Sequence, residues 1–94
     1  MTNSELREII ATMEISDDSN TIILEGDEFA DGFIGLTFDG NAVYSYERLV
    51  DSLSSHNKWS REEALEWIEY NTLRAIPYME SKGKVPIIIN EFLR

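Results

Sequence analysis

Three aspartates between residues 27 and 39 are the first side chains whose type and spacing could do chemistry. Asp27 and Asp31 stand four positions apart, and Asp39 follows in a predicted turn. Carboxylate oxygens are the ligands that hard cations such as Ca²⁺ and Mg²⁺ prefer. A calcium loop starting at Asp27 would need ligand oxygens at its third and twelfth positions, which are Phe29 and Phe38. The pattern therefore excludes a calcium loop. It leaves open a looser metal site, against the simpler interpretation of a solvated loop with turn-forming aspartates.

The single histidine, His56, offers little catalytic chemistry. The chain has no cysteine and no second histidine, so neither a zinc triad nor a Cys–His pair can be built around it. Serines are abundant, but none stands in the Gly-x-Ser-x-Gly elbow that exposes a nucleophilic serine. We expect His56, at the exit of a predicted helix, to cap backbone carbonyls. The sequence predicts no catalytic residue, no metal ligand set and no cofactor, and the protein is expected not to be an enzyme.

Glu62, Glu66 and Glu69 recur at helical spacing and form one acidic stripe on the helix predicted after residue 60. Trp67 and Tyr70 lie beside this stripe. Carboxylates on a solvent-facing side of a helix are common. Exposed aromatic side chains next to them are less common, because large exposed apolar side chains tend to mark interaction surfaces. These five residues are the predicted partner-binding site.

Three further polar residues receive structural roles. Asn71 falls beside the inward stripe of the same helix, so we expect a buried side chain that binds loop backbone groups. Arg74 is the only base between Arg61 and Lys82. We expect Arg74 to form an ion pair with a carboxylate of the loop predicted at residues 26–32, with Asp31 as the first candidate.

Composition narrows the classes of function. Eighteen acidic against eight basic residues give a net charge of −10, and no Lys or Arg occurs between Arg7 and Arg48. Direct binding of DNA, RNA or an anionic membrane is disfavoured, because each needs cations to neutralise phosphates. No apolar run approaches the roughly 20 residues that cross a bilayer, and the N-terminus lacks a signal-peptide pattern. We therefore expect a cytoplasmic protein whose partners are proteins with basic surfaces.

Hydrophobic periodicity predicts the helices that position these residues. The first helix spans residues 2–14 and begins with a Thr2–Glu5 capping box, and a second spans residues 46–54. The third and longest helix begins with a Ser60–Glu63 capping box and ends before Pro77. Its predicted inward stripe consists of Ala64, Leu65, Ile68 and Thr72.

Four strands are predicted around these helices. Residues 21–25 and 85–90 are short β-branched segments. Residues 33–38 and 41–46 flank Asp39-Gly40, a dipeptide suited to a two-residue type I′ turn, and so predict a β-hairpin. In that register Leu36 faces Val43 and Gly35 faces Tyr44. A turn at Gly40-Asn41 stays open as an alternative and keeps the same residues on each face of the hairpin. The predicted order is αβββααβ. Residues 1–94 should form one α+β, two-layer domain with a mostly antiparallel four-stranded sheet and helices packed on one face.

Four segments between residues 22 and 90 also carry a resemblance. They are Asp31-Gly-Phe-Ile-Gly35, Ala42-Val-Tyr-Ser-Tyr-Glu47, the run from Glu62 to Tyr78, and Pro86-Ile-Ile-Ile89. Together they resemble a family of small uncharacterised proteins of tailed bacteriophages and prophages, most specifically in the block Asn71-Thr-Leu-Arg-Ala-Ile-Pro-Tyr78. The resemblance implies a phage or prophage origin and work inside a bacterial cell. It implies no activity, and it leaves out the helix of residues 2–14.

Together these observations predict a non-enzymatic phage accessory protein that binds a host or phage protein. In its sharper form it inhibits a DNA-handling or defence complex by presenting carboxylates where phosphates would bind. Two alternatives stay open, a small metal-dependent enzyme that uses the acids of residues 27–39, and a structural or assembly component of the virion.

Overall fold

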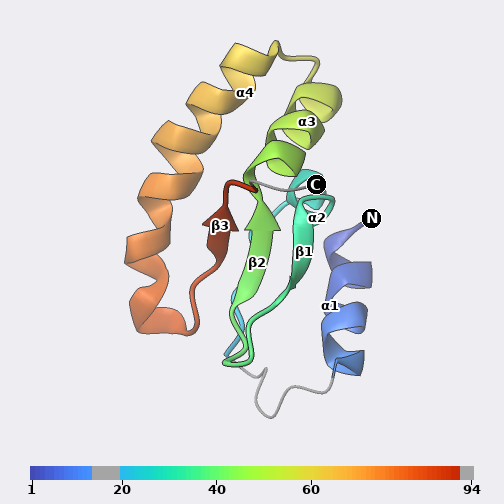
Figure 1. Cartoon of the computed structure of the whole chain (residues 1–94), viewed down its shortest axis with the longest axis vertical. Helices are drawn as coiled ribbons and strands as arrows, with labels where there is room; N and C mark the ends of the chain where they lie inside the picture. The colour runs from blue at the N-terminus through green and yellow to red at the C-terminus, as the bar shows by residue number, and fades with distance from the viewer. Residues whose placement is uncertain (14–19, 92–94) are drawn as a thin grey trace.

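The strands of the described residues form a three-stranded mixed sheet (Figure 1). The computed structural model describes residues 1–13 and 20–91. Strands β1 (Phe33–Leu36) and β2 (Ala42–Ser45) are antiparallel, and β3 (Ile87–Ile89) joins the other side of β2 in parallel. A parallel pair needs a long crossover connection, and the helical segments between β2 and β3 provide it. The architecture is α+β, as predicted.

The prediction of a mostly antiparallel four-stranded sheet is wrong, because the segment predicted as the first strand, residues 21–25, does not pair along its length. It forms one isolated parallel bridge, between Thr21 and Lys84. Beyond the bridge the chain turns inward, where Ile23 and Leu24 are buried. The backbone N–H of Leu24 donates to the Tyr44 hydroxyl at 3.0 Å, so a side chain takes the place of a strand partner. Of the last predicted strand, residues 85–90, only β3 is formed.

The predicted hairpin is confirmed, but its turn is not the predicted one. The backbone N–H of Thr37 donates to the Asn41 carbonyl at 2.9 Å, and that of Gly40 donates to the Thr37 carbonyl at 3.0 Å. Gly40 has φ 92°. This is a three-residue loop, in which a type I turn is followed by a residue with positive φ, instead of a two-residue type I′ turn.

The longer loop shifts the register of the hairpin by one residue. Gly35 lies opposite Val43 and Leu36 lies opposite Ala42, which corrects both predicted pairs. Leu36 thereby joins the face of Ala42 and packs against the core. An irregularity between Phe33 and Gly35 then brings Phe33 opposite Tyr44, and the two rings meet edge to face with centroids 5.9 Å apart.

The described residues form four α-helices, two of which begin with the predicted capping boxes at Thr2 and Ser60. They are α1 (Asn3–Thr12), α2 (Asp27–Ala30), α3 (Tyr46–Asn57) and α4 (Arg61–Trp67). Residue 14, the predicted end of the first helix, lies outside the described residues. Helix α2 was expected to be loop, and α3 runs three residues beyond the predicted end at residue 54.

The predicted third helix changes its hydrogen-bond pattern along its length. Helix α4 continues as a π-helix, η1 (Ile68–Leu73), and after a short helical link as a 3₁₀-helix, η2 (Ile76–Lys82). The α-helical pattern ends at Ala75, before Pro77, as predicted, but the chain continues as a 3₁₀-helix that was not predicted. Proline is tolerated in the first turn of a helical segment, and Pro77 lies in the first turn of η2. The segments α4, η1 and η2 form one long rod in Figure 1.

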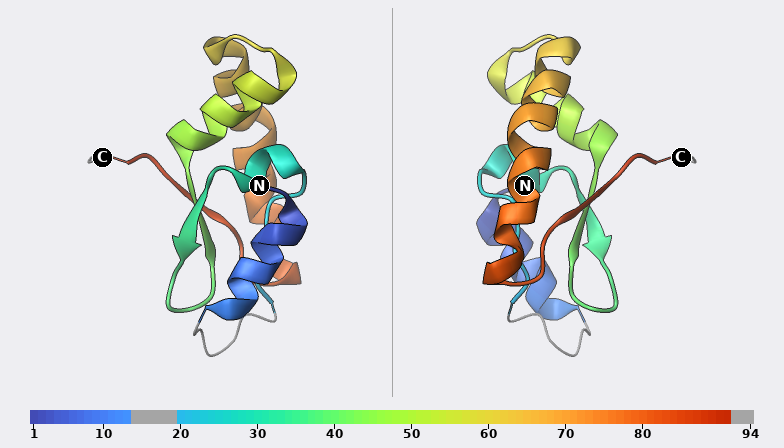
Figure 2. Two further views of the ribbon diagram at one scale, coloured as in Figure 1. Left: turned by 90° about the vertical axis from the view of Figure 1, so that its right-hand side faces the viewer. Right: turned by 90° about the vertical axis from the view of Figure 1, so that its left-hand side faces the viewer.

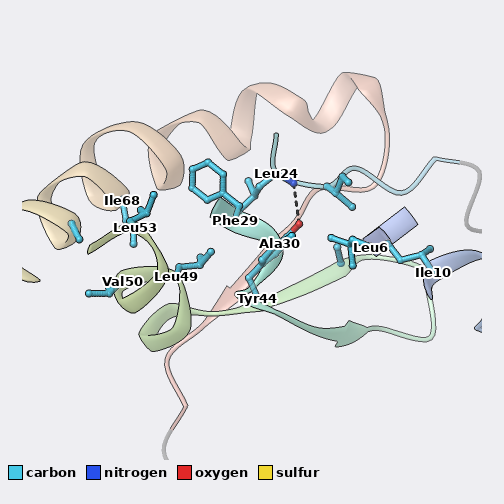
Figure 3. Packing of buried hydrophobic residues seen from close by; sticks show 13 residues of the cluster. Leu6, Ile10, Leu24, Phe29, Ala30, Tyr44, Leu49, Val50, Leu53 and Ile68 are labelled. Carbon is cyan, nitrogen blue, oxygen red and sulfur yellow. Dashed lines mark hydrogen bonds between the residues drawn. The ribbon is translucent and has the colours of Figure 1, made fainter. Parts of the chain in front are cut away.

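The core lies between the sheet and the helices. Helices α1 and α2 and the rod from α4 to η2 lie on one side of the strands, and α3 extends beyond the end of β2 (Figures 1 and 2). Tyr44 projects from β2 toward Leu24, while Leu6 and Ile10 enter from α1 (Figure 3). The predicted inward stripe of the long rod is confirmed, with Ala64, Ile68 and Thr72 buried and Leu65 partly buried.

Candidate functional site

An open groove runs along the outer side of α4 and η1. It has a volume of about 370 Å³, and its lining combines aromatic and acidic side chains with one amide. The lining residues are Trp59, Glu63, Glu66, Trp67, Tyr70 and Asn71. No basic residue is among them, so the groove is a concave, aromatic and negatively charged surface.

Local sequence explains why these side chains converge. The Ser60 capping box fixes the first turn of α4, where Ser60 Oγ accepts from the Glu63 N–H at 3.2 Å and Glu63 Oε1 accepts from the Ser60 N–H at 3.1 Å. Positions 63, 67 and 71 then recur at intervals of four, so their side chains share one side of the helical rod. Trp59, which precedes the cap, reaches the same side with its ring against Trp67. On the adjacent side of the helix, Ala64 and Ile68 are buried in the core.

The π-helical turn shapes the far end of the groove. Its hydrogen bonds run from i to i+5, one residue further than in an α-helix. Tyr70 and Asn71 both line the groove there, while Ile68 and Thr72 stay buried. The Asn71 side-chain amide donates to the Trp67 carbonyl at 3.1 Å, which supplies a backbone oxygen of the helix with a partner. Such π-helical turns are found frequently at functional sites.

Among the groove residues, Trp67 is held in place by two aromatic contacts. Its ring lies against Phe29 of the core, with centroids 5.9 Å apart, and against Trp59, with centroids 6.2 Å apart. Trp67 is nevertheless 36% exposed and Tyr70 is 59% exposed. A ring held on two sides and open to solvent on a third can contact a ligand with little loss of side-chain entropy.

The charges near the groove are mostly unneutralised acids. Arg61, at the start of α4, points toward α3, where its guanidinium contacts Glu47 at 2.6 Å and Asp51 at 3.6 Å. The Glu47 carboxylate raises the pKa of Arg61. Arg74 lies past the far end of the groove with its guanidinium carbon 4.7 Å from the centre of the Tyr70 ring. Neither arginine forms an ion pair with Glu63 or Glu66 within the described part of the chain.

All five predicted partner-binding residues lie at the surface, but they do not all line the same hollow. Glu66, Trp67 and Tyr70 line the groove. Glu69 instead lines a neighbouring hollow and accepts a hydrogen bond from the Tyr46 hydroxyl at 3.4 Å. Glu62 is exposed and lines neither surface.

Three groove residues were missed by the prediction: Trp59, Glu63 and Asn71. The sequence signal that could have identified them is their spacing of four residues, because Trp59, Glu63 and Asn71 lie at such intervals from Trp67. Asn71 was expected to be buried, and this is wrong, because its side chain is exposed. The buried position beside it is Thr72.

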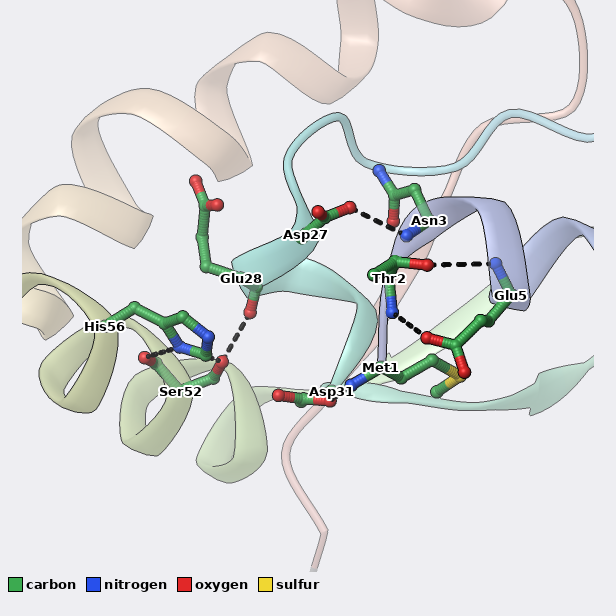
Figure 4. Close-up of polar contacts among 9 residues, drawn as sticks. All are labelled: Met1, Thr2, Asn3, Glu5, Asp27, Glu28, Asp31, Ser52 and His56. Carbon is green, nitrogen blue, oxygen red and sulfur yellow. Dashed lines mark hydrogen bonds and ion pairs between the residues drawn. The ribbon is translucent and has the colours of Figure 1, made fainter.

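The expected ion pair between Arg74 and Asp31 is also wrong. Asp31 Oδ1 accepts from the N-terminal ammonium of Met1 at 2.8 Å, which raises the pKa of that ammonium (Figure 4). Arg74 stacks on Tyr70 instead. Asp31 therefore joins the start of α1 to the end of α2, and Arg74 lies beside the groove, against Tyr70.

The three aspartates between residues 27 and 39 have different surroundings. Asp27 Oδ1 accepts from the backbone N–H of Asn3 at 2.8 Å, and Asp31 binds Met1 (Figure 4). Asp39 lies in the hairpin turn. Among residues 1–13 and 20–91, no three His, Cys, Asp or Glu side chains gather in a group that could hold a metal ion.

His56 caps a backbone carbonyl, as predicted. Its Nδ1 lies 2.9 Å from the Ser52 carbonyl oxygen and 3.3 Å from Ser52 Oγ (Figure 4). Ser52 Oγ donates to the Glu28 carbonyl at 2.5 Å. With Nδ1–H directed at one carbonyl and the serine proton at another, His56 cannot act as a general base toward Ser52 in this arrangement.

No helix within the described ranges has the length and apolar character needed to cross a membrane. Comparisons with protein-family models, with curated proteins and with solved structures give no match to this chain. The resemblance to proteins of tailed phages and prophages stays a prediction.

Proposed function

We propose that this protein is a small acidic accessory protein of phage or prophage origin that binds a partner protein in the bacterial cytoplasm. The observation that carries the proposal is the groove on α4 and η1. It places two tryptophans, a tyrosine and two glutamates on one concave surface of a chain with net charge −10. The partner is a host or phage protein with a basic surface.

The two kinds of side chain have different tasks in this binding. The acidic surface attracts a cationic partner over a distance and speeds the encounter, because opposite potentials steer diffusion. The aromatic rings supply desolvated contacts that hold the partner once it has arrived. A binding site of this kind needs no convergent nucleophile and base, whereas an enzyme active site does.

The acidic surface also suggests how binding could inhibit the partner protein. Basic surfaces on DNA-handling and defence proteins bind phosphates, and carboxylates on a helix face carry the same sign of charge as phosphates. We therefore propose that binding blocks the partner's nucleic-acid site. DNA should compete with this protein for the partner, and a DNA titration against the purified complex measures that competition.

Charge reversal tests the proposed binding surface. The partner is first identified by affinity purification from an infected or lysogenic host, and association and dissociation rates are then measured with the purified pair. The test variant reverses the three predicted acids of the long rod: Glu62→Lys, Glu66→Lys and Glu69→Lys. A control variant makes the same change in charge on exposed acids of α1, of the segment before α2 and of the hairpin turn: Glu8→Lys, Glu25→Lys and Asp39→Lys.

We expect the test variant to associate about tenfold or more slowly, since steered association rates depend strongly on local charge, while the control variant slows less. Trp67→Ala should act mainly on the dissociation rate, because it removes a contact made only in the complex. Equal effects of the two triple variants would mean that only net charge matters and would refute binding at this surface.

A further inference from the structure

We infer that the groove is a receptor for an arginine side chain of the partner protein. The inference rests on the proposed function and adds what the groove recognises. The first argument is complementarity of charge and shape. The lining holds three aromatic rings, two carboxylates and no base. Its volume of about 370 Å³ falls within the range of about 300–1,000 Å³ that is typical of sites for small ligands.

The second argument concerns which cation fits. A guanidinium is planar, stacks on aromatic faces and is more weakly hydrated than an ammonium, so it loses less when it leaves water for a ring surface. The chain itself contains this contact. The guanidinium carbon of Arg74 lies 4.7 Å from the centre of the Tyr70 ring, next to the groove. The guanidinium of an arginine from the partner could stack in the same way on the indole rings of Trp59 and Trp67, which line the groove.

The third argument identifies the carboxylate that would pair with the incoming arginine. Glu63 already uses one oxygen to close the capping box of α4. Glu66 is exposed and lines the groove, and its carboxylate makes no hydrogen bond or ion pair with any residue that the structure describes. It is the acid available for a charge-assisted hydrogen bond to a guanidinium, the geometry in which arginine exceeds lysine.

The chain carries a built-in reporter for this binding. Its only two tryptophans are Trp59 and Trp67, and both line the groove. Intrinsic tryptophan fluorescence therefore reports on the groove alone. The probes are two acetylated and amidated peptides of equal charge, with the sequences (Gly-Arg)₄ and (Gly-Lys)₄, titrated into the full chain at about 0.15 M salt.

We expect both peptides to change the fluorescence, with the arginine peptide binding at least about threefold more tightly than the lysine peptide. Glu66→Gln should weaken the arginine peptide about three- to tenfold. Glu62→Gln makes the same change of charge one turn away on α4, outside the groove, and should leave the affinity within about twofold. Both positions are exposed, so neither variant disturbs the core.

Two results would overturn the inference. One is equal affinity for the arginine and lysine peptides, or no fluorescence change with either. The other is an equal effect of Glu66→Gln and Glu62→Gln. Either result leaves the proposed function standing, because a basic partner could still bind by general charge attraction and contacts outside the groove. The proposed function fails separately, when the two triple charge reversals act equally on the partner.

Discussion

At the scale of single residues, Tyr44 links the sheet to the segment before α2. It is fully buried on β2, lies edge to face against Phe33, and accepts the Leu24 N–H through its hydroxyl oxygen. Without that hydroxyl, Leu24 would bury an unpaired backbone donor. Tyr44→Phe should therefore lower the free energy of unfolding by about 1–3 kcal/mol, measured by urea denaturation. Tyr46→Phe serves as the control, since the Tyr46 hydroxyl meets an exposed glutamate and should cost less.

The same residue predicts a dependence on alkaline pH. Burial raises the pKa of the Tyr44 hydroxyl. Because the folded-state pKa lies above the unfolded value of about 10, the contribution to stability is complete below about pH 10 and is lost as the pH rises through the folded pKa. Stability should fall above pH 10 in the wild type and fall less steeply in Tyr44→Phe. Parallel curves of unfolding free energy against pH for the two proteins would contradict this assignment.

Residue-level predictions succeeded where one local rule decides the outcome. The side chains at Thr2 and Ser60 cap their helices because a capping box is complete within four residues. Asn71 was misplaced by one position on the helix, since Thr72 is the buried neighbour. The partner of Asp31 could not be predicted, because the pairing depends on how α1 docks against α2, which no local pattern contains.

At the scale of elements, the hairpin turn can be tested with a pair of glycine substitutions. Gly40 has φ 92°, a conformation that an L side chain adopts only with strain. Gly40→Ala should lower the free energy of unfolding by about 1–2 kcal/mol. At Gly35, where φ is not positive, an added Cβ would meet no atom within 4 Å. Gly35→Ala should be neutral or stabilise by up to about 1 kcal/mol. Equal destabilisation by both substitutions would count against the three-residue loop.

The type of each helix or strand was easier to predict from the sequence than the way in which the strands pair. Asp39-Gly40 marks a hairpin in either case, but the dipeptide serves both a two-residue and a three-residue loop, so the register predicted from a two-residue turn was wrong by one residue. Residues 21–25 have strand composition, yet the described residues offer them one bridging position, at Lys84. The π-helical pattern of η1 was missed because six residues are too few to distinguish its spacing from that of an α-helix.

At the scale of the whole molecule, the net charge is the main property that could be predicted from the sequence. The excess of acids over bases follows from composition alone, while the concave arrangement of some of these acids with aromatic rings requires the fold. Trp59 and Trp67 are eight residues apart and belong to different segments, a loop residue and the last residue of α4. The capping box between them turns that spacing into a contact.

The net charge predicts how stability responds to salt. A charge of −10 on a chain of 94 residues destabilises the compact state by self-repulsion. The screening length falls from about 30 Å at 0.01 M to about 3 Å at 1 M ionic strength, so added salt relieves this repulsion. The midpoint of thermal unfolding, Tm, should therefore rise between 0.01 M and 0.5 M NaCl. A gain of about 1 kcal/mol corresponds to a rise of about 4–8 °C in a domain of this size.

The triple variant Glu8→Lys, Glu25→Lys and Asp39→Lys separates repulsion from other effects of salt. Each reversal adds two positive charges, so the variant carries −4 where the wild type carries −10. Its Tm at 0.01 M NaCl should exceed that of the wild type, and its rise with salt should be smaller, because less repulsion remains to be screened. A Tm that falls with added salt in both proteins would contradict this prediction. Attractive ion pairs such as the one between Arg61 and Glu47 would then outweigh the repulsion among the acids.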